Sequence, residues 1–377
     1  SKGFTGCAAT KISGGGLCAA FGHVEPSDST DIHFEDTLKG GEEIGDGRLA
    51  RILSNDVIPA VFELERYGAA FIRKRDKPNE YYSRLKVGGH TYPRVVTSPG
   101  EGRELSHCLR EEITRRNIDT VEEVMVTSLL TSKGKVGGAI GLEKNTGDFC
   151  LFRAKSTVLA SGGLGNLYPF TSNMSEATGD GFAMAYRAGA ELMDMEMVQF
   201  LPIAVCYPES LRGKDMADAG FFGPYGRLVN AKGERFMPRY DPELKELSTR
   251  AKVSRAIFIE VKEGRGTAHG GIWVDGRETK RKMPDWWEMI QQAFPHTIEL
   301  IEEAYGRAAA EWEEPFEAYP TQHYMMGGVR MGLWGETNVP GLYVVGEVAG
   351  GVHGANRLGG NSIADLQVFG VRAGQQA

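Results

Sequence analysis

A buried strand, a glycine-rich turn and a helix start follow one another near the end of the chain. The apolar residues 342–345 predict a short strand, and residues 353–362, HGANRLGGNS, predict a loop that opens a helix over 362–373. At such a junction the free N–H groups of the first helical turn and the positive end of the helix dipole favour an anionic group. Arg357 lies inside this loop rather than on a helix face. The segment therefore predicts an α/β fold with a ligand site at a strand-to-helix turn.

Glycine supports the same interpretation along much of the chain. The 377 residues include 50 glycines. Many stand in short clusters, at 14–16, 40–41, 88–89, 162–165, 327–328, 350–351 and 359–360. Because glycine permits positive φ and close approach of the backbone to a ligand, these turns suit a large, extended cofactor contacted from several sides.

Composition excludes several classes of protein. The net charge of −7 makes nucleic acid an improbable partner, and no apolar run approaches the ~20 residues of a membrane helix. The five cysteines form no C-x-x-C pair, so neither a disulfide framework nor an iron–sulfur site is predicted within this chain, and no metal site is predicted. Free thiols indicate a reducing compartment, the cytoplasm.

Hydrophobic periodicity predicts the elements and a division into parts. Helices are expected at 43–67, 106–116 with Ser106 as its cap, 181–190, 252–263 and 286–312, and strands at 122–131, 136–143, 149–152 and 157–160. Residues 196–318 are richer in Pro, Trp and charge. They predict an inserted α+β capping domain between 1–195 and 319–377, which together would form one ligand-binding domain.

Several further segments agree in order with one known family. They are Thr10 with Gly14–Gly16, residues 160–165 (ASGGLG), 178–181 (TGDG), 194–200 (DMEMVQF), 233–237 (GERFM) and 323–328 (HYMMGG). With residues 353–362 they resemble the flavoprotein subunit of succinate dehydrogenases and fumarate reductases. The resemblance implies a Rossmann-like FAD-binding domain with an inserted capping domain. It also implies that the sequence is a fragment lacking the first Rossmann strand with its G-x-G-x-x-G turn and the C-terminal helical domain.

The resemblance assigns a cofactor and its contacts. The residues that match FAD contacts of the family are Thr10, Gly15, Gly16, Ala160, Gly162, Gly163, Asp180, Glu347, Ser362 and Ile363. Covalent members attach FAD through a histidine that aligns with Ala9. Since alanine cannot form that bond, FAD is expected to be held non-covalently.

The resemblance also assigns a proton path. In fumarate reductases an arginine protonates the substrate carbon and is resupplied through a glutamate and a second arginine. These positions match Arg250, Glu209 and Arg212. Because arginine normally stays protonated, it can donate only if it is reprotonated at once. Ala251 stands where the family has Asp after the first arginine, so Arg250 is expected to lack a supporting carboxylate.

One half of the family's substrate clamp is present. His323 and Arg357 match the groups that hold a substrate carboxylate near the flavin, and arginine suits bidentate carboxylate recognition. Leu201 stands in place of the histidine that holds the far carboxylate, and Pro208 replaces a threonine. A buried carboxylate without donors is costly, so the substrate is expected to be a small carboxylate other than simple fumarate or succinate, unless other residues substitute.

The expected function is a hydride exchange between FAD and a carbon–carbon bond next to a carboxylate. Two alternatives stay open. One is an adenylylsulfate-reductase-like or L-aspartate-oxidase-like enzyme; the other is a non-catalytic flavin electron-transfer subunit. The resemblance implies that the electron partner is a separate iron–sulfur subunit. Cytoplasmic placement is expected, with any membrane association made through partner subunits.

Overall fold

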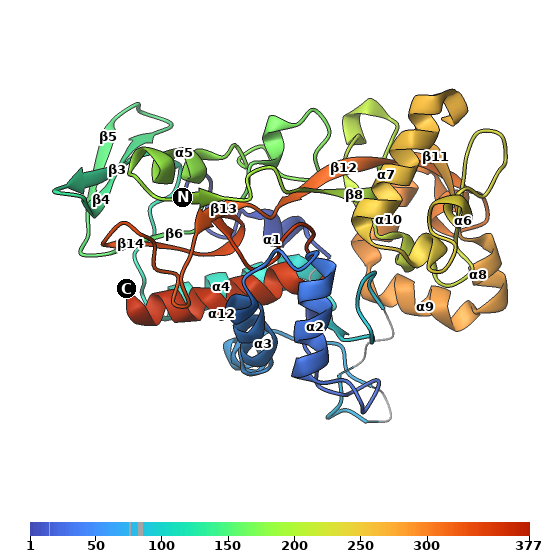
Figure 1. Ribbon diagram of the computed structural model, residues 1–377, viewed down its shortest axis with the longest axis horizontal. Helices are drawn as coiled ribbons and strands as arrows, with labels where there is room; N and C mark the ends of the chain where they lie inside the picture. Colours follow the sequence, from blue (N-terminus) through green and yellow to red (C-terminus); the bar gives the residue numbers. More distant parts are fainter. Residues whose placement is uncertain (15, 75–76, 82–85) are drawn as a thin grey trace.

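The computed structural model describes residues 1–14, 16–74, 77–81 and 86–377. It has a mixed α/β fold with two main hydrophobic cores. One core belongs to the unit that contains both chain ends, and the other belongs to the segment between residues 203 and 318. Figure 1 shows the second unit beside the first, with the long strands β8 and β12 running between them.

The first unit is built from helices and short strands. Its helices are α1 (Ala9–Ile12), α2 (Thr30–Gly40), α3 (Gly47–Tyr67), α4 (Glu101–Arg115), α5 (Asp180–Arg187) and α12 (Asn361–Gln376). Its short strands are β1 (Leu17–Cys18), β2 (Val95–Val96), β6 (Thr157–Leu159), β7 (Leu192–Met193), β13 (Gly328–Arg330), β14 (Leu342–Val344) and β15 (Ala349–Gly350). Strands β6 and β14, far apart in sequence, pair in parallel. This pairing aligns the turns that follow both strands.

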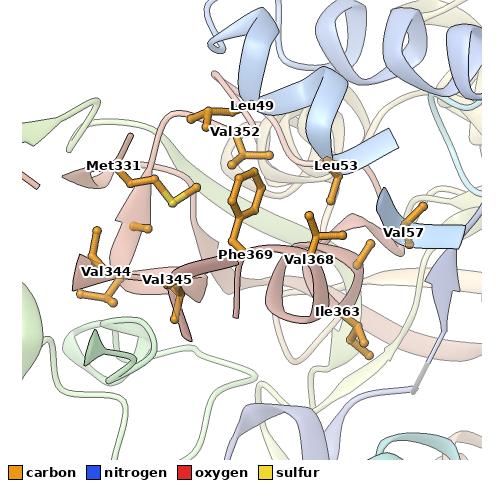
Figure 2. Packing of buried hydrophobic residues seen from close by; sticks show 14 of the residues in the cluster. Leu49, Leu53, Val57, Met331, Val344, Val345, Val352, Ile363, Val368 and Phe369 are labelled. Carbon is orange, nitrogen blue, oxygen red and sulfur yellow. The ribbon is translucent and has the colours of Figure 1, made fainter. Parts of the chain in front are cut away.

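The packing of α3 against α12 fixes the glycine-rich loop. Asp46 caps α3 by accepting a hydrogen bond from the Arg48 N–H at 2.9 Å, and the helix ends at Gly68, whose φ is 107°. Figure 2 shows Leu49, Leu53 and Val57 of α3 close to Val368 and Phe369 of α12. The spacing of these apolar positions is helical, so the buried stripe positions α12 and the loop before it.

A three-stranded antiparallel sheet lies at one end of the molecule (Figure 1). It consists of β3 (Val124–Ser132), β4 (Lys135–Glu143) and β5 (Phe149–Arg153). These strands confirm the alternation predicted from the sequence.

The second unit, the cap, contains an antiparallel sheet with strand order β10-β11-β12-β8-β9. Its strands are β8 (Val198–Val205), β9 (Asp215–Ala217), β10 (Arg227–Val229), β11 (Ile272–Asp275) and β12 (Phe316–Met325). Its helices are α6 (Met237–Tyr240), α7 (Arg250–Glu260), α8 (Arg277–Lys282), α9 (Pro284–Ala293), α10 (Pro295–Tyr305) and α11 (Arg307–Ala310). Trp312 and Phe222 pack in its core with ring centroids 5.2 Å apart.

Two predicted helices differ from the structure. The predicted helix 286–312 is wrong: Pro295 starts a new helix, and Gly306, with a φ of 89°, separates α10 from α11. The helix expected from Ser106 begins earlier, at Glu101, so Ser106 lies inside it and is not a cap. The expected domain boundary at 319 falls inside β12, and the division into domains stays a prediction.

Within the described residues, no helix combines the length and apolarity that crossing a bilayer requires.

Candidate active site

One large cavity of about 1630 Å³ lies between the two units. The predicted FAD contacts among its lining residues are Thr10, Gly16, Ala160, Gly162, Gly163, Asp180, Glu347, Ser362 and Ile363. Ala9, at the start of α1, also lines it. Gly15 lies outside the described residues. The structure therefore brings these predicted contacts, which span most of the sequence, to one cavity.

The turn after β6 leaves room for a ligand. Gly162 has a φ of 74° and a Cβ there would meet no atom within 4 Å, whereas a Cβ at Gly163 would lie 2.1 Å from Oε1 of Glu347. Glu347 accepts a hydrogen bond from the Met325 N–H at 2.9 Å. Burial raises the pKa of Glu347 to about 7, so a hydroxyl or N–H donor from a ligand would relieve its desolvation.

A second carboxylate lies at the start of α5. Asp180 forms an ion pair with Lys2, with Nζ 2.6 Å from Oδ2, and accepts a hydrogen bond from Oγ1 of Thr178 at 3.0 Å. Both Lys2 and Asp180 line the cavity. An ammonium and a carboxylate side by side suit the phosphates and hydroxyls of a dinucleotide.

The N-terminus of α12 faces the same cavity. Gly360 has a φ of 82°, and the helix that follows is 16 residues long. Ser362 and Ile363, in its first turn, line the cavity. Together with the open turn at Gly162 and the buried Glu347, this helix end fits FAD: it offers free N–H groups where an isoalloxazine gathers negative charge on reduction.

Arg357 is buried beside this helix start. Its side chain packs with its guanidinium carbon 4.5 Å from the ring centroid of Tyr324, and only 3% of the residue is exposed. Nη1 donates to the Leu358 carbonyl at 3.1 Å, while Nε finds no hydrogen-bond partner in the described part of the chain. Burial, followed by the nearby Arg250, lowers the pKa of Arg357 to about 10, so it remains charged at neutral pH. A buried cation with an unused donor suits a carboxylate ligand.

His323 lies on β12 and lines the same cavity. Its Nδ1 is 2.7 Å from Oγ of Ser172. Burial, with smaller contributions from Arg250 and Arg357, holds the pKa of His323 well below its ordinary value. The neutral imidazole can act as a hydrogen-bond donor or acceptor rather than as a second cation.

Arg250 is the first residue of α7 and faces the cavity from the cap. Its Nε and Nη2 donate to the two oxygens of Asp218, both at 2.7 Å, and Nη1 donates to Oε1 of Gln199 at 3.0 Å. The expectation that Arg250 lacks a supporting carboxylate is therefore wrong. Burial alone would lower the pKa of Arg250, but Asp218 outweighs it and the pKa lies above the ordinary value.

Glu209 and Arg212 lie elsewhere on the cap. Nη1 of Arg212 donates to Oε2 of Glu209 at 3.0 Å, and the guanidinium carbon stacks 3.9 Å from the ring centroid of Phe170. The side chain of Glu209 is 78% exposed. Among the described residues, neither of the two lines the cavity or bonds to Arg250. The structure thus brings the two together but not to Arg250, and their relay role stays a prediction.

A different acid lies on the cavity wall. Asp215 begins β9, three residues before Asp218, and both line the cavity with Arg250. Burial raises the pKa of Asp215 to about 7; Arg250 opposes this shift and Asp218 adds to it. Near neutral pH this carboxyl can hold or release a proton.

Part of the cavity wall is apolar. Leu201 of β8 is 1% exposed and lines the cavity. Lys214, which precedes β9, is exposed and lines it too. Pro208 is not among the lining residues in the described part of the chain.

The sequence interpretation missed several of these groups, namely Lys2, Ser172, Lys214, Asp215 and Asp218. A sequence signal existed for the last two: two acids follow the E-x-x-R motif before the next strand pattern. What it lacked was the pairing of β8 with β9, which turns this segment toward Arg250.

Known proteins share this sequence over its whole length. The family described as FAD binding domain matches residues 1–363. A fumarate reductase (CoM/CoB) flavoprotein-type relative from Methanothermobacter marburgensis, named as one subunit of that enzyme, is 47% identical over all of this chain and 67% of its own length. L-aspartate oxidase 2-b from Nicotiana tabacum is 34% identical over 93% of this chain and 54% of its own length.

A solved structure agrees with these relatives. The structure of an FrdA variant from E. coli quinol fumarate reductase matches with a TM-score of 0.88 and 31% identity, covering 100% of this chain and 64% of that one. The chain thus spans between about half and two thirds of the proteins that it matches.

Proposed function

Because the chain belongs to the FAD-binding family of the fumarate reductase and succinate dehydrogenase flavoproteins, we propose that the whole protein is a FAD-dependent oxidoreductase that reduces a C=C bond next to a carboxylate. One observation carries the proposal. Arg250, Arg357 and His323, which come from the cap, the glycine-rich loop and β12, line the same cavity as the predicted FAD contacts.

The carboxylate of the substrate would be held by Arg357 and His323. The unused Nε of Arg357 and the imidazole of His323 give donors of two kinds. Drawing charge toward that carboxylate makes the adjacent alkene carbon electron-poor. Because Arg357 is held by Tyr324 and its own loop, it enters the reaction already oriented.

Arg250 would protonate the other alkene carbon. Asp218 and Gln199 use all three of its nitrogens as donors and hold the guanidinium on the cap side of the cavity. An arginine in this position keeps its proton until the neighbouring carbon acquires negative charge.

FAD, once bound, supplies the hydride. The residues that would hold it are those of the turn at Gly162, the carboxylates of Asp180 and Glu347, and the first turn of α12. We propose non-covalent binding, since Ala9 carries no nucleophile.

The substrate would carry one carboxylate and a less polar far end. Leu201 offers no donor where it lines the cavity, and burying a carboxylate against it would cost several kcal/mol. A 2-enoate with an uncharged substituent fits this arrangement.

Fumarate is a second candidate. The M. marburgensis relative bears the name of a fumarate reductase, and the cation of Lys214 lines the cavity on the cap side. If Lys214 receives the far carboxylate, Leu201 need not. Electrons would reach FAD through a separate iron–sulfur subunit, in keeping with the relative's description as one subunit.

Turnover by the full-length holo-protein tests the proposal. Reduced viologen serves as the electron donor, and fumarate is compared with 2-enoates that carry one carboxylate. Oxidation of L-aspartate and reduction of adenylylsulfate test the alternative chemistries. Turnover of an enoate or of fumarate that is lost in Arg250→Ala supports the proposal. Activity only on L-aspartate or adenylylsulfate contradicts it, and no activity on any of these compounds favours an electron-transfer subunit.

A further inference from the structure

The segment between Gly213 and Asp218 carries two carboxylates that the family resemblance did not assign. It follows the pair formed by Glu209 and Arg212 and leads through β9 into the cavity. Asp218 grips Arg250 through both oxygens, and Asp215 lies on the same wall. A surface pair at Glu209 and a cavity pair at Asp215 and Asp218 are thus two different routes to the same arginine.

Resting on the proposed function, we propose that Asp218 positions Arg250 and that Asp215 returns the proton that Arg250 gives to the substrate. Glu209 and Arg212 then have no part in the proton path. The proposal concerns a positioning residue and a proton donor for the reaction already proposed.

The geometry of Asp218 supports its positioning role. Two parallel N–H···O bonds of 2.7 Å fix the plane of the guanidinium, and such fork-to-fork pairs are strong and directional. The third nitrogen bonds to Gln199, which itself donates to Asn356 Oδ1 at 2.9 Å. Arg250 is therefore held from the cap by Asp218 and from the glycine-rich loop through Gln199.

The proton balance requires a nearby acid. When the alkene carbon forms its new C–H bond, an N–H bond of Arg250 breaks and a neutral guanidine remains. The O–H bond of the Asp215 carboxyl then breaks, the proton restores the guanidinium, and Asp215 is left as a carboxylate that solvent reprotonates. Asp215 can do this at neutral pH because its pKa is raised to about 7 by burial.

The charged surroundings of Asp215 come from several elements. The groups are Arg250, Asp218, Arg357 and Glu101, the neighbouring Lys214, and His296, Glu299 and Glu303 on α10, which packs against β9 and lines the cavity. Arg250 favours the charged form of Asp215, and Asp218 opposes it.

The test uses the holo-protein and four isosteric or conservative variants, each checked for FAD content. Steady-state turnover of the best substrate is measured from pH 5 to 9. Asp218→Asn is expected to lower kcat by about 100-fold or more with a small change in KM, and Asp218→Glu to recover part of the loss. Asp215→Asn is expected to lower kcat and to remove the fall in activity that the wild type shows as pH rises through about 7. Glu209→Gln, the matched control, is expected to match the wild type.

A second measurement does not depend on turnover. Infrared spectra of the protein with labelled aspartate should show one carboxylic acid C=O band that titrates near pH 7 and is absent in Asp215→Asn. If Asp215→Asn and Asp218→Asn both keep the wild-type kcat and pH profile while Glu209→Gln is slow, the inference is overturned and the proposed reaction stands. If Arg250→Ala keeps its activity, the proposed reaction and the inference both fail.

Discussion

Gln199 connects the two arginines of the cavity. Its Oε1 accepts from Nη1 of Arg250 at 3.0 Å, and its Nε2 donates to the backbone oxygen of Arg357 at 2.7 Å. A single buried amide thus sets the distance between the group that would protonate the substrate and the group that would bind it.

Replacing Gln199 by Leu should separate these two functions. Both hydrogen bonds are lost while the volume is nearly kept, so kcat should fall by about 10-fold or more and KM should rise. Removing one partner of buried polar groups also costs about 1–3 kcal/mol of stability. Asn230→Leu, another buried amide that lies in the cap, is the control. It should lose stability without changing KM; equal kinetic effects in both variants would contradict the role given to Gln199.

Arg250→Ala and Arg250→Lys should both lower turnover by about three orders of magnitude or more, because the last proton donor or its planar fork is lost. Flavin absorbance should be unchanged, since the predicted FAD contacts lie elsewhere. The measurement is enoate turnover beside the absorbance spectrum. A variant that retains more than about a tenth of the activity would remove Arg250 from the proton path.

FAD should leave the protein on acid precipitation, because Ala9 cannot form a covalent bond to it. All yellow colour is expected in the supernatant. A covalently flavinylated succinate dehydrogenase serves as the positive control. Flavin fluorescence that stays on the denatured polypeptide band would be incompatible with this prediction.

Fumarate should be a poor substrate of the wild type, with turnover below about 10 per second. Leu201→His should raise kcat/KM for fumarate by supplying the missing donor, whereas Leu201→Phe, which changes only the shape, should not. Steady-state rates with reduced viologen decide the point. Fast fumarate turnover that falls in Lys214→Ala would favour the second candidate instead.

Glu347 should make the apo-protein less stable at high pH. Its folded-state pKa, about 7, lies above the ordinary value of 4.5, so the folded state holds a proton that the unfolded state has lost between these two values. This contribution is complete below about pH 4.5 and disappears as pH rises through about 7, a change of at most about 3 kcal/mol. Urea unfolding of the wild type and Glu347→Gln at pH 5 and pH 8 measures it. The gap between the two proteins should change in favour of the variant at pH 8; a constant gap would contradict the prediction.

Local patterns predicted most of the fold, and their failures have physical causes. The helical stripe of Leu49, Leu53 and Val57 and the alternation of β3 to β5 could be interpreted from spacing alone. The predicted helix 286–312 failed because apolar periodicity continues through a proline and a glycine that end the helices locally.

The site followed the same division. Residues in long motifs, such as Arg357 and His323, were predicted from the sequence and do line the cavity. The carboxylate that holds Arg250 could not be predicted, because Asp218 is 32 residues away and meets it only through the folded cap. Expecting the partner at the next position in sequence ignored such long-range pairs.

The long strands β8 and β12 are paired with each other within the cap sheet, yet Gln199 on β8 bonds to the glycine-rich loop and His323 on β12 lines the cavity between the units. A chimaera that received the cap of a relative would therefore exchange these two residues along with Arg250 and Asp218. Substrate choice would be inherited with the cap, whereas the recipient would keep its own Arg357 and its own hold on the nucleotide.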